Sequence, residues 1–264
     1  MRADVFLTEV GYAESRQRAK IYIDSGFVLI DGKTVKKASE SVDETVEHEV
    51  VITDCERYVG RGGYKLEGAL EAFNIDVTGK HCIDIGASTG GFTDCLLQKG
   101  AASVIAVDSG RDQLHPRLRN DGRVRSLEGV NARYLTPQLV GVDALDIAVM
   151  DVSFISQTLI IPQIPQLLGN GGVFISLIKP QFEAGRGALN KNGIVKNTEN
   201  RYSAALRVVT CALSCGFELI GFDVSPIKGG DGNVEFLAAF RLGRTGQAIT
   251  DDAINKTIRT KVFR

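Results

Sequence analysis

The sequence lacks the features that direct a protein into or across a membrane. Its N-terminus has no apolar signal-type core, and no uninterrupted apolar run is long enough to cross a bilayer. The net charge of −1 gives no whole-chain sign of nucleic-acid binding, so any basic surface must be local and offset by acids elsewhere. We therefore expect a cytoplasmic protein without membrane contacts.

Cysteine is scarce, and its spacing fits no metal site. The two cysteines nearest each other, Cys211 and Cys215, lie four positions apart in a stretch that predicts a helix, with no second pair or histidine cluster nearby. We expect no metal ion and interpret the thiols as reduced. The other three cysteines are Cys55, Cys82 and Cys95.

What is present is enough apolar material for folded domains. The chain has 264 residues, of which 44% are hydrophobic and 24% charged, so one small and one medium domain can each bury a core. Residues 1–57 predict the small one. Helices are expected over 2–10 and 15–24, with Ser15 as the N-cap of the second and Ser25-Gly26 as its end.

A β-hairpin is predicted to follow these helices. The strand 27–30 is joined to its return strand by Asp31-Gly32, a strong two-residue turn signal, and 49–52 predicts a further strand. Basic residues gather around the second helix and the hairpin, and an acidic stretch follows. These candidates for RNA contact are Arg16, Arg18, Lys20, Lys33, Lys36 and Lys37.

The rest of the chain predicts a doubly wound α/β domain. A glycine-rich linker, 58–63, precedes it, the domain itself spans 64–245, and a basic tail covers 246–264. Strands and helices alternate along it, which is typical of a Rossmann-like sheet. Strands are expected over 82–85, 104–108, 145–151, 172–178, 217–224 and 234–241, with helices near 66–73, 159–168 and 198–215.

A glycine-rich turn between the first strand and the next helix predicts a nucleotide site. Glycines let the backbone turn sharply and approach a ligand, and Asp108 ends the following strand, where an acid can hold a ribose diol. The residues of the turn are Asp84, Gly86, Ser88, Gly90, Gly91 and Phe92.

The composition of this turn favours S-adenosylmethionine over a dinucleotide. Ser88 occupies the place of the middle glycine of a dinucleotide-binding turn, and Asp84 stands just ahead of it. A carboxylate at that point suits the ammonium group of S-adenosylmethionine better than a diphosphate. NAD is the alternative cofactor.

Several motifs in order resemble the TlyA family of ribosomal RNA 2'-O-methyltransferases, which are related to the FtsJ-like enzymes. The N-terminal unit is similar to the S4 type of RNA-binding domain that this family carries. The likeness covers nearly the whole chain. The motifs are Arg61-Gly-Gly-Tyr-Lys-Leu66, Asp84-Ile-Gly-Ala-Ser-Thr-Gly-Gly-Phe92, Asp151-Val-Ser-Phe-Ile-Ser156, Lys179-Pro-Gln-Phe-Glu183 and Gly193-Ile-Val195.

The resemblance implies methylation of a cytidine ribose 2'-oxygen in ribosomal RNA, and we expect free ribosomal RNA or ribosomal subunits as the partner and no obligate protein partner. It also implies a catalytic tetrad of Lys65, Asp151, Lys179 and Glu235, with Asn131 as the candidate for the adenine contact. Some family members are called hemolysins, but no amphipathic or apolar membrane segment here suggests a pore.

The residues themselves agree with this implication. Asp151 and Lys179 each follow a predicted parallel strand, at the carboxyl edge where open α/β sheets bind ligands. A ribose hydroxyl becomes a good nucleophile only as its proton leaves, so one lysine must act as the base. We expect Lys179 in that role and Lys65 as an orienting group, with the reverse as the alternative. Gly68 and Ala69 would leave room for substrate above Lys65.

Two other functions stay open on the sequence alone. Base-amino methyltransferases carry Asp/Asn-Pro-Pro-aromatic where this chain has Asp151-Val-Ser-Phe154, so the acid and the aromatic ring are present and the prolines are not. The chain could instead be a non-catalytic RNA-binding or ribosome-assembly factor, although retention of all four polar tetrad positions argues against that.

Overall fold

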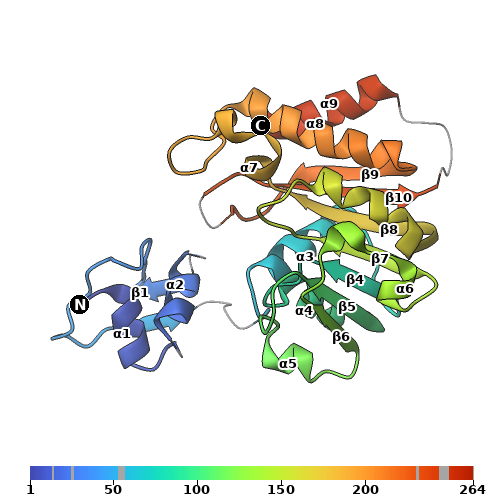
Figure 1. The fold of residues 1–264 in the computed structure, drawn as a ribbon. Coiled ribbons are helices and arrows are strands. Elements are labelled where there is room, and N and C mark those ends of the chain that lie inside the picture. The colour runs from blue at the N-terminus through green and yellow to red at the C-terminus, as the bar shows by residue number, and fades with distance from the viewer. Residues whose placement is uncertain (14, 25–26, 53–56, 230–231, 244–249, 264) are drawn as a thin grey trace. The chain divides into compact units, whose positions relative to one another are not determined.

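The computed structural model divides the chain into two compact units, Met1–Tyr58 and Val59–Arg264. It describes residues 1–13, 15–24, 27–52, 57–229, 232–243 and 250–263 (Figure 1). The expected helix end at Ser25-Gly26 and Cys55 lie outside these described residues.

The first unit is a small α+β domain with its own core. Its three-stranded sheet has the order β2-β1-β3, and both helices contribute to a cluster that includes Leu7, Ile23 and Val28. The backbone N–H of Arg18 donates to Ser15 Oγ at 3.2 Å, so the predicted cap is confirmed. The elements are α1 (Ala3–Glu9), α2 (Arg16–Asp24), β1 (Val28–Ile30), β2 (Lys33–Thr34) and β3 (Val50–Ile52).

The predicted hairpin turn is also confirmed. Asp31 and Gly32 have φ values of 51° and 72°, and the antiparallel register pairs Ile30 with Lys33. Positive φ at both central residues is the geometry of the turn that matches the twist of the flanking strands.

The second unit is built on a seven-stranded sheet in the order β6-β5-β4-β7-β8-β10-β9. Neighbours from β6 to β8 are parallel, whereas β10 runs antiparallel to both β8 and β9. This confirms the Rossmann-like fold, but the antiparallel strand departs from a standard dinucleotide-binding sheet. The strands are β4 (His81–Ile85), β5 (Ser103–Asp108), β6 (Val124–Glu128), β7 (Leu145–Met150), β8 (Leu168–Ile178), β9 (Phe217–Val224) and β10 (Phe236–Leu242).

Helices cover both faces of this sheet (Figure 1). Alternate strand residues such as Ile83 and Phe240 join a core with α8, whereas α3 and α4 pack against each other and against the strands on the other face. The helices are α3 (Gly62–Ala72), α4 (Gly91–Gln98), α5 (Pro116–Arg119), α6 (Pro137–Val140), α7 (Pro180–Glu183), α8 (Thr198–Ser214) and α9 (Asp251–Val262).

The helix expected over 159–168 is wrong. Three 3₁₀ turns, η2 (Gln157–Leu159), η3 (Ile161–Gln163) and η4 (Pro165–Leu167), occupy this segment instead. Pro162 and Pro165 have no backbone N–H to donate, and each ring would clash with the preceding turn of an α-helix. Most of the apolar side chains, Ile160, Ile161, Ile164 and Leu167, are buried in these short turns, so the hydrophobic pattern alone could not distinguish the two structures.

The helices at the two ends of the second unit differ from what the sequence predicts there. Helix α3 begins at Gly62, inside the expected linker. In the expected tail, α9 packs on α8 and β9 through Ile254, Ile258 and Val262, which are buried. The tail is therefore an amphipathic helix whose apolar face completes the core.

The antiparallel β10 has a consequence for the site. Phe236, its first residue, pairs with Ile178, the last residue of β8. The residue before β10, Glu235, therefore lies at the same edge of the sheet as Lys179, which follows β8. An all-parallel sheet would put a strand's start and its neighbour's end at opposite edges.

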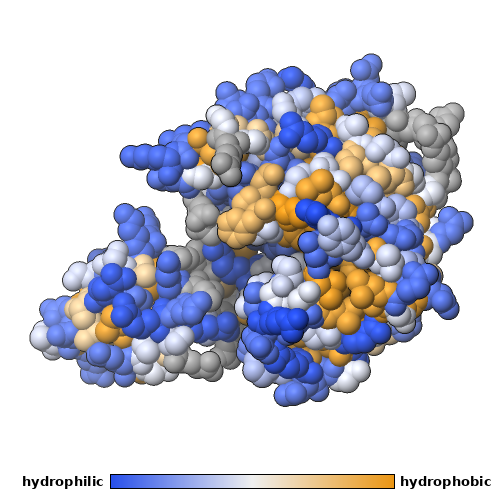
Figure 2. Space-filling model, in the orientation of Figure 1, coloured by the Kyte–Doolittle hydropathy of each residue, from blue (hydrophilic) through white to orange (hydrophobic). Residues whose placement is uncertain are grey.

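The exterior of the second unit is polar with apolar areas among the charged side chains (Figure 2). The exposed large apolar residues include Leu139, Leu159 and Phe154, the last of them 92% exposed. No helix in the described part of the chain is long and apolar enough to cross a membrane.

Candidate active site

The glycine turn after β4 has a backbone that other residues could not easily adopt. Gly86 has a φ of 86°, and a Cβ atom there would lie 2.4 Å from the main-chain oxygen of Asp151. Both facts require glycine, because L-residues are strained at this φ and a side chain would collide with backbone. Gly86 thus lets the ends of β4 and β7 approach each other.

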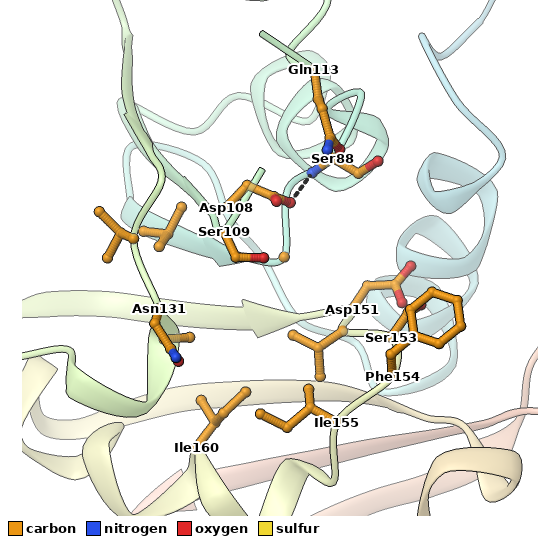
Figure 3. A pocket seen from close by; sticks show the side chains of 15 residues that line it. Ser88, Asp108, Ser109, Gln113, Asn131, Asp151, Ser153, Phe154, Ile155 and Ile160 are labelled. Carbon is orange, nitrogen blue, oxygen red and sulfur yellow. Dashed lines mark hydrogen bonds between the residues drawn. The ribbon is translucent and has the colours of Figure 1, made fainter. Parts of the chain in front are cut away.

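A cavity of about 370 Å³ opens beside this turn (Figure 3). Ser88 and Asp108 lie at one end, Asn131 faces them across the opening, and Asp151 lies beside Phe154 at the other end. Ile155 and Ile160 supply apolar wall. Four of the predicted cofactor residues, Gly86, Ser88, Asp108 and Asn131, therefore meet at one cavity.

Asp108 is fixed by the backbone around it. Its Oδ2 accepts a hydrogen bond from the N–H of Ser88 at 2.7 Å, and its Oδ1 accepts one from the N–H of Gly110 at 2.7 Å. Each carboxylate oxygen has a second lone pair, so the group can still accept hydrogen bonds from a ligand diol. Ser88 has a φ of 48°, a strained value for serine.

Asp84 is fully buried, with 0% of its surface exposed. Its Oδ2 accepts hydrogen bonds from the N–H and the hydroxyl of Thr93, at 2.9 and 2.7 Å. Its Oδ1 is buried without a partner among the described residues. Burial, with a smaller contribution from the charge of Asp151, raises the pKa of Asp84 to about 7. An unpaired buried acceptor of this kind is costly unless a ligand or water donates to it.

The remaining residues of the turn make close packing contacts, and two of them, Gly91 and Phe92, also line the space beside Lys179. A Cβ atom on Gly90, where φ is 98°, would lie 2.2 Å from Leu118 Cδ1, so Gly90 makes room for α5. A Cβ on Gly91 would lie 3.0 Å from the N atom of Gly63, and the Phe92 ring is buried against Gly62. These contacts hold α4 against the start of α3.

A second cavity, of about 210 Å³, adjoins the first and contains Lys179. The two cavities share Gly86, Ser88, Asp151 and Ser153. Asp151 thus stands between the space beside Asp108 and the space beside Lys179.

The four tetrad residues form two ion pairs. Lys179 Nζ lies 2.5 Å from Asp151 Oδ1, and it also donates to Ser153 Oγ at 3.0 Å. Lys65 Nζ donates to Glu235 Oε2 at 2.5 Å. The second pair is the more deeply buried, because Lys65 is 7% and Glu235 is 2% exposed.

The space expected above Lys65 is absent. A Cβ atom on Gly68 would lie 2.8 Å from Pro226 Cγ, and Ala69 is fully buried. The small residues on this face of α3 therefore allow close packing and leave no room there for a substrate. Lys65 lines neither of the two cavities, whereas Lys179 lines the smaller one.

Sequence reasoning missed two residues of the site. Ser153 joins Lys179 through its hydroxyl. Phe154 has a φ of 65°, and its ring centroid lies 5.2 Å from that of Phe182. Both follow directly after β7, and position at a strand end was the signal that could have found them.

In the first unit the predicted RNA-binding side chains are mostly exposed. Arg16, Lys20, Lys33, Lys36 and Lys37 face solvent. Arg18 is half-buried, and its Nε donates to the Tyr22 hydroxyl at 3.0 Å. Arg16 lies 3.3 Å from Asp4, whose pKa Arg2 and Arg16 together lower to about 2.

Among the described residues there is no group of three or more histidine, cysteine or acidic side chains that could hold a metal ion. The described cysteines, Cys82, Cys95, Cys211 and Cys215, form no disulfides. Burial raises the pKa of the Cys82 thiol to about 12, which makes it chemically inert.

The fold and this arrangement of cavities are those of a Rossmann-like methyltransferase. The model of the FtsJ-like methyltransferase family matches residues 58–242, and that of the S4 domain matches residues 1–48. The chain belongs to the FtsJ-like methyltransferases and, within them, to the TlyA (hemolysin A) family.

Several relatives extend over nearly the whole chain. A 16S/23S rRNA (cytidine-2'-O)-methyltransferase TlyA from Mycobacterium tuberculosis is 42% identical over 97% of this chain and 97% of its own. Hemolysin A from Brachyspira hyodysenteriae is 43% identical over 91% of this chain and 99% of its own. A solved structure of a candidate hemolysin from Streptococcus thermophilus superposes with a TM-score of 0.76 at 42% identity, covering 98% of this chain and 94% of that one.

Proposed function

We propose that the protein transfers a methyl group from S-adenosylmethionine to the ribose 2'-hydroxyl of a cytidine in ribosomal RNA. The single observation that carries this proposal is the adjacency of the two cavities at Asp151, one suited to the cofactor and the other containing Lys179. The names of the TlyA relatives and the S4 domain support ribosomal RNA as the substrate, and we extend this to intact ribosomal subunits in the cytoplasm.

The larger cavity fits the cofactor in volume and in polar groups. Asp84 is buried beneath the turn and lines neither cavity, but its unpartnered Oδ1 would accept from the ammonium group of the cofactor. Asp108 would hold the ribose diol, and Asn131 would lie along the adenine. When bound, the sulfonium supplies an electrophilic methyl group. Gly86 and Ser88 would lie against the cofactor, Gly91 and Phe92 line the smaller cavity, and Gly90 packs against α5.

Lys179 is the base in this proposal. Its amine lines the smaller cavity, where a target ribose would lie, and Asp151 and Ser153 hold it there. A protonated amine has no lone pair, so the neutral form must take the proton of the 2'-hydroxyl as the new oxygen–carbon bond forms. The carbon–sulfur bond breaks in the same step. Lys65, buried with Glu235, acts as an orienting group.

The aromatic rim supports RNA as the substrate. Phe154 is 92% exposed at the edge of the larger cavity and contacts Phe182. An exposed ring beside a catalytic cavity offers a stacking surface for an unpaired base.

Transfer of a labelled methyl group from S-adenosylmethionine to isolated ribosomal subunits tests the proposal. The wild-type chain should label the RNA, and Lys179→Ala should reduce the rate by about 10²–10⁴-fold, the usual contribution of a positioned base. The affinity for S-adenosylhomocysteine should change little in this variant. A wild-type chain that binds subunits but transfers no label would favour the non-catalytic assembly factor instead.

A further inference from the structure

A buried hydrogen-bond network adjoins the site and has no role in the steps above. Its centre is Glu183, which is 3% exposed in α7. Oε2 of Glu183 accepts from the Ser156 hydroxyl at 2.6 Å, and Oε1 accepts from the backbone N–H of Gln157 at 2.8 Å. Both donors lie at the far end of the loop that carries Asp151 and Ser153.

The side chain of Gln157 extends the network to β8. Its Nε2 donates to the main-chain oxygen of Leu177 at 2.6 Å, and its Oε1 accepts from the Ser176 hydroxyl at 2.5 Å. Gln157 is 1% and Ser176 is 0% exposed, so no water replaces these partners at low cost. Every polar atom of the Gln157 side chain is thus used to join the loop to β8.

The hydrogen bonds to Leu177 and Glu183 lie on either side of Lys179 in the sequence. Leu177 lies two positions before it and Glu183 four positions after it, and the same loop meets Lys179 directly through Asp151 and Ser153. Arg207 of α8 fixes the later segment by donating to the main-chain oxygen of Glu183 at 2.6 Å. Hydrogen bonds therefore connect the loop 151–156 to the chain segments before and after Lys179.

The loop 151–156 needs these hydrogen bonds because its backbone is strained at Phe154. Phe154 adopts a left-handed φ of 65°, and its side chain is almost wholly exposed, so its own burial does not hold it there. Non-glycine residues in this region persist only where surrounding contacts impose them. Beyond Phe154, Ile155 packs against the hydrophobic core, and the next residues, Ser156 and Gln157, donate hydrogen bonds to Glu183.

We infer that Glu183, acting through Ser156 and Gln157, is a positioning residue that sets the loop 151–156 against Lys179 for methyl transfer. It touches neither cavity, so it does not act on the reacting atoms. The inference rests on the proposed function for its kinetic consequence, but not for its geometry.

The test uses Glu183→Gln in the full chain, which keeps the side chain's shape and removes one of the two acceptors. Glu67→Gln is the matched control, because Glu67 is also a buried glutamate but pairs with Lys99, the residue that follows α4. Three quantities are measured: kcat and KM for ribosomal subunits, the Kd for S-adenosylhomocysteine, and amide hydrogen exchange over residues 152–157.

For Glu183→Gln we expect kcat to fall by about 10- to 100-fold, the range that small misplacements of reacting groups cause. KM and Kd should stay within about twofold, since binding groups are untouched, while exchange at Gln157 accelerates. The control should keep its wild-type kcat. Wild-type kcat in Glu183→Gln, or equal losses of kcat and cofactor affinity, would overturn the inference.

If Glu183→Gln does not fold, Ser156→Ala removes one hydrogen bond of the same network. This variant must also lower kcat while the Kd for S-adenosylhomocysteine stays within about twofold. The exchange measurement keeps this test independent of the proposed reaction. A chain with no methyltransferase activity refutes the proposed function, whereas unchanged exchange at Gln157 refutes the positioning network.

Discussion

Lys65 and Glu235 stand 170 residues apart in the sequence, yet their Nζ and Oε2 atoms lie 2.5 Å apart in a buried ion pair. Removing one partner leaves the other charge buried without compensation. Lys65→Ala should therefore lower the free energy of unfolding by about 3–5 kcal/mol, measured by urea denaturation.

The double variant Lys65→Met/Glu235→Leu separates stability from activity. Apolar residues of similar volume should restore most of the stability that Lys65→Ala loses, while methyl transfer stays impaired. Lys80→Ala is the control, since Lys80 and Asp146 form an exposed pair worth at most about 1 kcal/mol. A Lys65→Ala protein as stable as this control would show that the buried pair contributes nothing.

Asp84 predicts pH-dependent cofactor binding. Because burial raises its pKa to about 7, much of the free protein carries a neutral carboxyl at pH 6, and a cationic ligand binds the charged form better. The Kd for S-adenosylhomocysteine, which keeps the ammonium group, should fall as pH rises from about 6 to about 8, with a proton released on binding. Asp84→Asn should weaken binding and abolish this dependence in calorimetry. A pH-independent Kd in the wild type would contradict the contact.

His48 should make the first unit more stable in acid. Its Nδ1 lies 2.7 Å from Asp31 Oδ2 and its Nε2 lies 2.7 Å from the main-chain oxygen of Asp43, so both nitrogens face acceptors and the protonated ring satisfies both. The hydrogen bond to Asp31 is the main cause that raises the pKa of His48 above its usual 6.5.

The direction of the pH dependence of stability follows from the raised pKa of His48. A raised pKa in the folded state contributes stability that is fully present below 6.5 and is lost as pH rises through the raised value. After correction for the intrinsic pH dependence of exchange, amide protection in β1 and β2 should decrease over that range. In His48→Gln the decrease should be absent, and a wild-type profile that is flat would contradict it.

The exposed basic residues of the first unit should bind phosphate. Replacing Arg16, Lys20 and Lys33 with Gln should weaken RNA affinity and reduce the salt dependence of log K by up to about 0.9 per lost contact, or about 0.7 on single strands. Lys256→Gln, an exposed charge on α9, is the control. An unchanged salt slope in the triple variant would mean that the RNA lies elsewhere.

The sequence predicted those parts of the site that depend on local order along the chain. The turn after β4 and the acid at the end of β5 belong to consecutive strands of the sheet. The Rossmann-like alternation therefore brings them to the same edge. Placing Lys179 beside Asp151 needed only that β7 and β8 be parallel neighbours, and they are.

Other features depended on tertiary structure that no local pattern contains. The position of Glu235 follows from β10 running antiparallel between β8 and β9, which its apolar sequence does not reveal. Gly68 could not be distinguished from a substrate-facing residue until Pro226 was seen against it. The Glu183 network joins residues 19 to 27 positions apart, partly through backbone groups that every sequence shares.

The measurement that tests the central claim most directly is the position of the methyl group in the product. Ribosomal RNA treated with the protein and S-adenosylmethionine is digested to nucleosides and analysed by mass spectrometry, with alkaline hydrolysis in parallel. The account predicts a cytidine methylated on its ribose, which protects the following phosphodiester from alkali. A methyl group on the base, above all on the exocyclic amine of cytosine, would contradict it and assign Asp151-Val-Ser-Phe154 to base-amino methylation.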